Sequence, residues 1–405
     1  MSPPTLSQPS ETAQPRKRPA AVDGQTALLV ALGAAAFMIN LDARVVAPLL
    51  PAMAADLHVS LPRAGWLVSA YLLPYGLLQL AYGPIADRIG KINVCAHAMA
   101  AFSLGTALCA YWPSFHMILA LRAFTGAAAA GLIPLMLAYV GDTVPYERRQ
   151  ATLSALMASA GAAQAFSTGA GGSIAAALSW HAVFPCLGAL SIVVTLALYG
   201  YRKRALHVRA QPNTGFTSAL RAPRLRVLLA LVATEGFLYQ GAFSYLSGLL
   251  HERFGLQALE IGLIMALAGV AQLLTASVLP RWFAARSERA ALAWGGSTIG
   301  LAYLACGFAP HWSVVALGCA GLGAGFIQAH TTLQLRATEV LPGSRATALA
   351  LFAFSLFFGS GIGAVALGGL IVPLGFSGMF ALTGCGLLAF TGVALAVLTP
   401  RAVRS

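Results

Sequence analysis

The stretch GPIADRIGKINV, residues Gly83–Val94, gathers charge in a chain that carries little of it. Asp87, Arg88 and Lys91 fall within five positions here, although only 9% of the 405 residues are charged. Two glycines bracket these charges, and long apolar runs lie on both sides. The stretch is therefore expected to form a polar turn between two buried segments.

The composition is that of a membrane protein. The chain is 58% hydrophobic with a mean hydropathy of +0.77, and a water-soluble domain needs far more charged surface. A bilayer span needs about 20 apolar residues, and helices are expected because backbone groups in lipid must be bonded internally. We predict twelve spans, at approximately 26–50, 63–83, 91–112, 115–138, 151–177, 179–200, 226–250, 259–281, 290–310, 312–334, 345–371 and 375–398.

The basic residues orient these spans. With a cytoplasmic N-terminus, 21 of the 25 Lys and Arg residues fall on the cytoplasmic side, which the positive-inside rule favours. We therefore expect a multi-pass protein of the bacterial inner membrane with both termini in the cytoplasm. The net charge of +13 then favours anionic lipid headgroups as partners, and no nucleic-acid role is expected.

The predicted spans divide six and six. We expect a disordered tail at 1–24, an N-terminal bundle at 25–201, a linker at 202–225, a C-terminal bundle at 226–398 and a tail at 399–405. The six cysteines are scattered without metal-ligand spacing and are interpreted as packing residues.

The two halves form an internal repeat. Asp142 and Glu339, Arg148 and Arg345, and several glycine pairs are each separated by 197 positions. Because six spans separate the copies, both halves have the same orientation and are related by an axis along the membrane normal. Such halves can rock about a central site, so the repeat favours a transporter over a scaffold.

The opening stretch resembles a motif of the major facilitator superfamily, G-x-L-A-D-R-x-G-R-K between helices 2 and 3. Gly83, Asp87, Arg88, Gly90 and Lys91 match it, and the resemblance extends from about Gln25 onward. It implies an all-α membrane fold of twelve helices in two six-helix repeats. It also implies that Asp87 acts in gating, by closing the cytoplasmic side against the start of helix 11.

Two further motifs refine the resemblance. Arg122 and Gly126 match the superfamily's helix-4 pattern. The antiporter motif of helix 5, G-P-x-x-G-G, keeps its last two glycines but has Ser167-Thr168 in place of Gly-Pro. The first helix is similar to bacterial exporters of the drug-efflux and arabinose-efflux type.

Four charges are predicted to lie well inside a span: Asp42, Arg44, Arg122 and Glu235. Such charges face a cavity or a partner. Asp42 and Arg122 lie at similar depth, so we expect an ion pair or a shared hydrogen-bond network, either coupled to protons or permanently structural. Arg44 is interpreted as snorkelling to the outer headgroups, and pairing with Asp42 is the alternative.

Glu235 is the first candidate for a proton site. It has no basic neighbour one turn away, and a low-dielectric setting favours the neutral form of such a carboxyl. His330 lies at comparable depth and could partner it, although a packing or capping role is the alternative. For Glu235 the alternative is a neutral side chain bonded to a helix carbonyl.

Further polar side chains could line a substrate cavity, each with helix–helix bonding as the alternative: Asn40, Tyr71, Gln164, Tyr239, Gln240, Tyr245, Gln328 and Gln334. A cavity with so few charges favours an amphiphilic or modestly polar organic substrate over a phosphorylated one. The chain shows no enzyme, phosphate-loop, cofactor or metal signature. We expect a monomeric secondary transporter, with proton-coupled export of a small molecule ahead of uptake by symport or uniport, and of a non-transporting membrane sensor.

Overall fold

The computed structural model describes residues 20–112, 114–202, 216–285, 287–341 and 344–398, and every regular element in these ranges is helical. The N-terminal half contains α1 (Ala20–Val45), η1 (Ala47–Leu49), α2 (Leu50–Asp56), α3 (Leu61–Ala64), α4 (Trp66–Leu78), α5 (Tyr82–Ile89), α6 (Lys91–Leu108), α7 (Phe115–Ala129), α8 (Leu132–Thr143), α9 (Tyr146–Ala177) and α10 (Trp180–Tyr201). The C-terminal half contains α11 (Phe216–Ala219), α12 (Pro223–Glu235), η3 (Gly236–Gln240), α13 (Gly241–Phe243), α14 (Leu246–Phe254), α15 (Ala258–Ala285), α16 (Glu288–Gly307), α17 (Trp312–Val340) and α18 (Arg345–Leu398).

These helices follow the predicted spans closely. Within the described residues, eight continuous helical segments are long and apolar enough to cross a membrane, and the bent pair Leu61–Leu78 with Tyr82–Ile89 makes a ninth. One of the eight lies within α18, whose backbone leaves the helical conformation at Gly375, the first residue of the last predicted span. The all-α membrane fold is confirmed, and the count of twelve spans stays a prediction.

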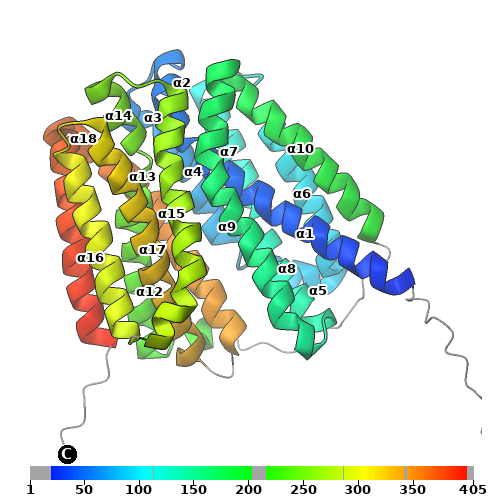
Figure 1. Ribbon diagram of the computed structural model, residues 1–405. Coiled ribbons are helices and arrows are strands. Elements are labelled where there is room, and N and C mark those ends of the chain that lie inside the picture. The colour runs from blue at the N-terminus through cyan, green and yellow to red at the C-terminus, as the bar shows by residue number, and fades with distance from the viewer. Residues whose placement is uncertain (1–19, 113, 203–215, 286, 342–343, 399–405) are drawn as a thin grey trace, which may run out of the picture.

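The first residue of α1 and the last residue of α18 lie at the same end of the molecule, which we call the terminal side (Figure 1). The opposite end, which carries α2, α3 and α14, is the far side. Helix α1 begins at Ala20, inside the predicted tail, and the rest of that tail lies outside the described residues. Residues 203–215 of the predicted linker and 399–405 also lie outside them.

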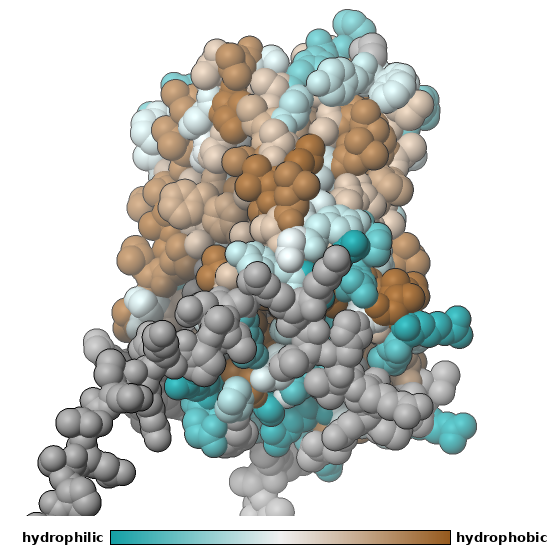
Figure 2. Space-filling view, turned by 90° about the vertical axis from the view of Figure 1, so that its right-hand side faces the viewer, coloured by the Kyte–Doolittle hydropathy of each residue, from teal (hydrophilic) through white to brown (hydrophobic). Residues whose placement is uncertain are grey.

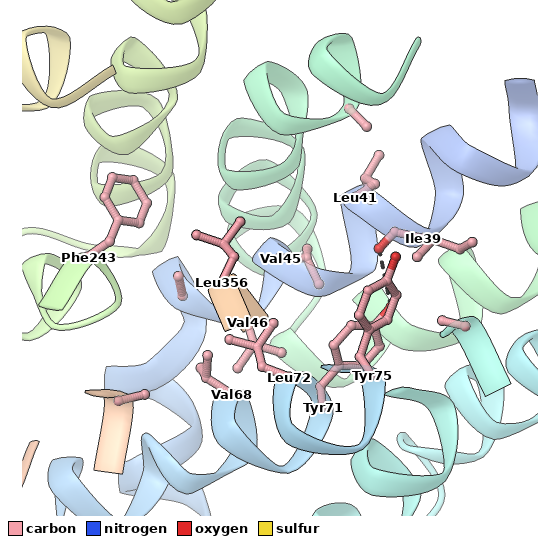
Figure 3. Close-up of a cluster of buried hydrophobic side chains, with 14 of the residues drawn as sticks. Ile39, Leu41, Val45, Val46, Val68, Tyr71, Leu72, Tyr75, Phe243 and Leu356 are labelled. Carbon is pink, nitrogen blue, oxygen red and sulfur yellow. Dashed lines mark hydrogen bonds between the residues drawn. The ribbon is translucent and has the colours of Figure 1, made fainter. Parts of the chain in front are cut away.

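The halves meet through two pairs of helices, α4 against α18 and α9 against α15. Along the first pair the Ser69 hydroxyl donates a hydrogen bond to the carbonyl of Gly361 over 2.7 Å. Figure 3 shows the apolar layer beside this contact, in which Val68 and Leu72 of α4 lie near Leu356 of α18. The terminal-side helices α5 and α8 pack within the N-terminal half.

Backbone packing repeats between the halves. Gly126 of α7 lies against the backbone of Tyr71 in α4, and Gly323 of α17 lies against the backbone of Ala268 in α15. Both members of each contact are separated from their counterparts by 197 positions. A Cβ atom at either glycine would overlap the facing carbonyl oxygen, so the same close helix approach requires glycine in both halves.

Ion pairs on the terminal side repeat as well. The Lys91 ammonium lies 2.8 Å from the Asp142 carboxylate. The corresponding positions hold two acids, Glu288 and Glu339, and the Arg336 guanidinium lies between them at 2.7 and 3.2 Å. The C-terminal half thus keeps a link between α16 and α17, but its cation, Arg336, lies in α17, whereas Lys91 lies in α6, the counterpart of α16.

The surface is banded as a bilayer requires. In Figure 2 apolar residues gather over the upper and middle part of the visible face, and hydrophilic residues gather at its two ends. Large apolar side chains that are more than half exposed include Val30, Val193, Leu274 and Leu317, all within long helices. Lipid is the medium that such side chains fit.

The motif stretch forms a bent connection. Helix α5 is inclined by 58° to the segment that precedes it. At Gly90 the backbone turns with φ 92° and ψ 139°, a region open almost only to glycine, and α6 begins at the next residue. Gly83 lies inside α5 with open space beside its Cα atom. In this conformation Gly90 is therefore the motif position that requires glycine, and Gly83 is not.

Replacing Gly90 by alanine should lower the melting temperature of the detergent-purified protein. A side chain in this backbone region costs about 1–3 kcal/mol. Gly83→Ala is the matched control, because alanine has room there and is the better helix former by about 1 kcal/mol. Equal losses in the two variants, measured by thermal unfolding, would contradict the assignment.

Candidate functional site

The centre of the N-terminal half holds a buried ion pair. Asp42 near the end of α1 accepts a hydrogen bond from the Arg122 guanidinium of α7 over 2.6 Å, and both side chains are completely buried. A second guanidinium nitrogen donates to the Asp42 carbonyl over 3.3 Å. The predicted Asp42–Arg122 contact is therefore present. The other carboxylate oxygen of Asp42 has no hydrogen-bond partner among the described residues.

Tyr71 supports this pair. Its ring lies under the Arg122 guanidinium at 4.4 Å from the ring centre, and its hydroxyl donates to the carbonyl of Ile39 over 3.4 Å. Figure 3 shows Tyr71 beside Tyr75, pointing toward α1. Tyr71 is fully buried, packs against the cation and makes the helix–helix bond that was its alternative. Its role in a substrate cavity stays a prediction.

Arg44 lies two residues beyond Asp42 and joins the halves. Its guanidinium donates a hydrogen bond over 2.9 Å to the amide oxygen of Gln240, which ends the η3 segment of the other half. The prediction that Arg44 snorkels to the headgroups is therefore wrong, and so is the alternative that it pairs with Asp42. A helix position fixes the face of a side chain but not what packs against that face.

The C-terminal half has its own pair at the corresponding helices. Glu235 ends α12, and one oxygen of its carboxyl lies 3.0 Å from Nδ1 of His330 in α17. The Glu235 side chain is 1% exposed and His330 is 15% exposed. The other carboxyl oxygen of Glu235 has no partner among the described residues. The predicted partnership is present, and unlike the Asp42–Arg122 pair it has an exposed edge.

Aromatic rings hold the imidazole in place. His330 stacks on Phe326, one turn earlier in α17, with ring centres 4.7 Å apart, and Phe352 lies 5.1 Å away. Tyr239 stacks on the same Phe326 at 4.3 Å. The two phenylalanines are site residues that the sequence analysis missed, although the Phe–His spacing of four in one helix was a usable signal.

A change of helix type follows Glu235. Residues Gly236–Gln240 form a π-helical segment, which shifts the side chains after it relative to a regular helix. Within it Tyr239 is 2% exposed, and its carbonyl accepts a hydrogen bond from the Tyr303 hydroxyl. The cavity role of Tyr239 stays a prediction. Tyr245 is likewise buried, and its hydroxyl donates to the carbonyl of Ala364, which is the helix–helix bond given as its alternative.

The remaining predicted cavity residues behave differently from one another. Asn40 and Gln328 are part-buried and donate to carbonyls one turn back in their own helices, at 2.8 and 3.1 Å. Gln334 is exposed. The side chain of Gln164 lies outside what the structure describes.

The motif residues lie at the terminal side of the N-terminal half. Asp87 and Arg88 are exposed and make no side-chain hydrogen bond or ion pair with any residue that the structure describes. Lys91 is the motif residue that is engaged, with Asp142 of the same half. The latch between Asp87 and the start of helix 11 therefore stays a prediction, and in this conformation Asp87 is not engaged.

Comparison with known proteins finds a family model that matches most of the chain. The Major Facilitator Superfamily model matches residues 32–364. The chain is 28% identical to the uncharacterized MFS-type transporter YceJ of Bacillus subtilis, over 81% of this chain and 85% of that protein. It is 30% identical to the putative multidrug resistance protein MdtD of Pectobacterium carotovorum, over 40% of this chain and 35% of that protein.

A solved structure shares the fold. The crystal structure of a D-xylose-proton symporter superimposes with a TM-score of 0.75 and covers 93% of this chain and 98% of its own, at 14% sequence identity. At that identity the likeness concerns the arrangement of the helices and not the activity.

Removing one charge of the buried Asp42–Arg122 pair should lower the stability of the folded protein. Asp42→Asn leaves the Arg122 cation without its counter-charge, which costs about 3–5 kcal/mol in a buried setting. We expect a lower melting temperature and less folded protein on size exclusion. Asp56→Asn is the control, because that carboxylate is half exposed beside His181 at 3.4 Å and such pairs contribute about 1 kcal/mol or less. Equal effects at the two positions would contradict a structural role for the pair.

Proposed function

Because the chain belongs to the major facilitator superfamily, we propose that it exports a small organic molecule in exchange for protons. Members of this family are carriers rather than enzymes. The names of several relatives, such as the putative multidrug resistance protein MdtD, support export. The observation that carries the proton coupling is the Glu235–His330 contact at the centre of the second half.

Glu235 has the setting of a reversible proton site. Its carboxyl is buried, has one oxygen without a partner among the described residues, and faces an imidazole rather than a permanent cation. An imidazole can both accept and donate a proton, so in this proposal the Glu235–His330 contact takes up and releases one. The exposed edge of His330 gives that proton a route to solvent.

The Asp42–Arg122 pair serves a different purpose in this proposal. Its cation stays charged at all physiological pH values, and neither side chain is exposed. The pair is closed off from solvent in this conformation, whereas His330 has an exposed edge. We therefore place proton exchange at Glu235 and assign Asp42 to linking α1 with α7.

The conformation fits one stage of alternating access. The positive-inside prediction makes the terminal side cytoplasmic. In this assignment Arg44 and Gln240 join the halves toward the outside, and Asp87 is disengaged on the cytoplasmic side. Protonation of Glu235 from outside would change the balance between the two orientations of the halves and let substrate leave.

The substrate is proposed to be amphiphilic or modestly polar. The charged side chains of the spans are already paired or bonded within the protein, so the site offers no free cluster of cations for a phosphate. The aromatic rings around His330 offer flat apolar contact surfaces instead. We propose that the monomer is the working unit.

Uptake by proton symport is the second candidate, because a D-xylose-proton symporter shares the fold. Proteoliposomes with an imposed pH gradient separate the two directions of transport. A membrane sensor without transport is the third, and it would show no substrate-dependent proton flux.

Glu235→Gln should abolish efflux driven by a pH gradient while the protein still folds. The amide keeps the size of the side chain but cannot exchange a proton. Thr234→Val is the control, because this exposed neighbour bonds only to the carbonyl of Ala230 in its own helix. Full gradient-driven efflux by the Glu235→Gln variant in proteoliposomes would contradict the assignment of Glu235 as the proton site.

Asp87→Asn should slow the conformational cycle and leave substrate affinity little changed. The predicted latch forms in the opposite conformation, so the loss should appear as a slower turnover with an inward-open bias. Glu252→Gln removes an exposed carboxylate at the far side and serves as the control. Unchanged transport rates for Asp87→Asn, measured beside that control, would count against the latch.

A further inference from the structure

A groove of about 950 Å³ lies on the N-terminal half, away from the Asp42–Arg122 pair. Three helices line it: α1 and α10 form its walls, and α9 contributes Arg148. Its lining residues are mostly small and apolar: Thr26, Ala27, Val30, Ala31, Ala34, Val193, Val194, Ala197 and Tyr201. It is a separate site from those assigned to protons and substrate.

The groove exists because this half carries small side chains. At the positions 197 residues later, Ala31 is replaced by Leu228 and Ala34 by Leu231. Both leucines are buried, at 0% and 7% exposure. The larger side chains fill space that the N-terminal half leaves open, so the repeat itself shows that the groove is not required by the fold.

The groove faces the bilayer. Val30 and Val193 on its two walls are 67% and 65% exposed, and both lie within apolar helices. Figure 2 views the molecule from this side and shows apolar residues over its upper and middle part. An apolar trough of this kind suits an extended acyl chain.

Cations mark the terminal-side end of the groove. Arg148 lies in the first turn of α9, is exposed, and its side chain makes no hydrogen bond or ion pair with any residue that the structure describes. Arg149 beside it bonds the carbonyl of Val144, and Arg202 at the end of α10 lies over the ring of Tyr199 at 4.9 Å. Of these three cations, Arg148 is the one that lines the groove and is available to an anion.

We propose that this groove binds one anionic phospholipid. The acyl chain lies between α1 and α10, and the phosphate meets the Arg148 guanidinium at the membrane surface. Charge complementarity selects an anionic headgroup, because the same end also carries Arg149 and Arg202. The proposal depends on the membrane fold and not on the direction or the substrate of transport.

The test is native mass spectrometry of the full-length protein in detergent, titrated with phosphatidylglycerol or with phosphatidylcholine. The wild type should retain one phosphatidylglycerol more tightly than phosphatidylcholine. Arg148→Gln should weaken that binding about fivefold. Arg345→Gln is the matched control, because Arg345 is the exposed repeat counterpart of Arg148, and it should leave binding unchanged.

A second variant tests the apolar part of the groove. Val193→Phe copies the residue at the corresponding position, Phe390, into the groove wall. Because Val193 is exposed, the variant should keep the melting temperature of the wild type while it loses the tightly bound lipid. Equal retention of both lipids, unchanged binding in Arg148→Gln or Val193→Phe, or an equal loss in Arg345→Gln would each overturn the proposal.

Discussion

A charge inside an apolar helix bundle must find a partner, and this constraint organises the protein. The Asp42–Arg122 pair ties α1 to α7 with both side chains fully buried. Arg44, two residues further, bonds Gln240 of the opposite half. An unpaired charge at these depths would cost several kcal/mol, so the positions of the helices and the positions of the charges depend on each other.

The two halves of the repeat make these interactions with different residues. Each half joins its first and fourth predicted helices by a polar pair, but the residues differ: an ion pair with arginine in one half, and Glu235 with His330 in the other. The first pair contains a guanidinium and the second an imidazole, so the two halves make the same helix contact with different chemistry.

A side-chain pairing could be predicted from the sequence where the depth of each residue along its helix indicated the partner. Asp42 and Arg122 lie at similar depth on their predicted helices, and this depth together with the family resemblance predicts the pairing that the structure contains, with Arg44 as the alternative partner. Prediction failed where the outcome depended on which helix packs against a given face. The sequence predicts that Arg44 lies at the headgroups or on Asp42, yet Arg44 bonds Gln240 of the other half.

The sequence by itself determined the all-helical membrane fold, the two-fold repeat and the family. Hydropathy, repeat spacing and motif can be recognised without knowing which helices touch. Only the tertiary structure decided that Arg44 reaches across to Gln240, that His330 is clamped by Phe326 and Phe352, and that alanines leave a groove beside Arg148. These contacts join residues far apart in the chain. They depend on how the helices cross, and helical periodicity gives only the face of each residue.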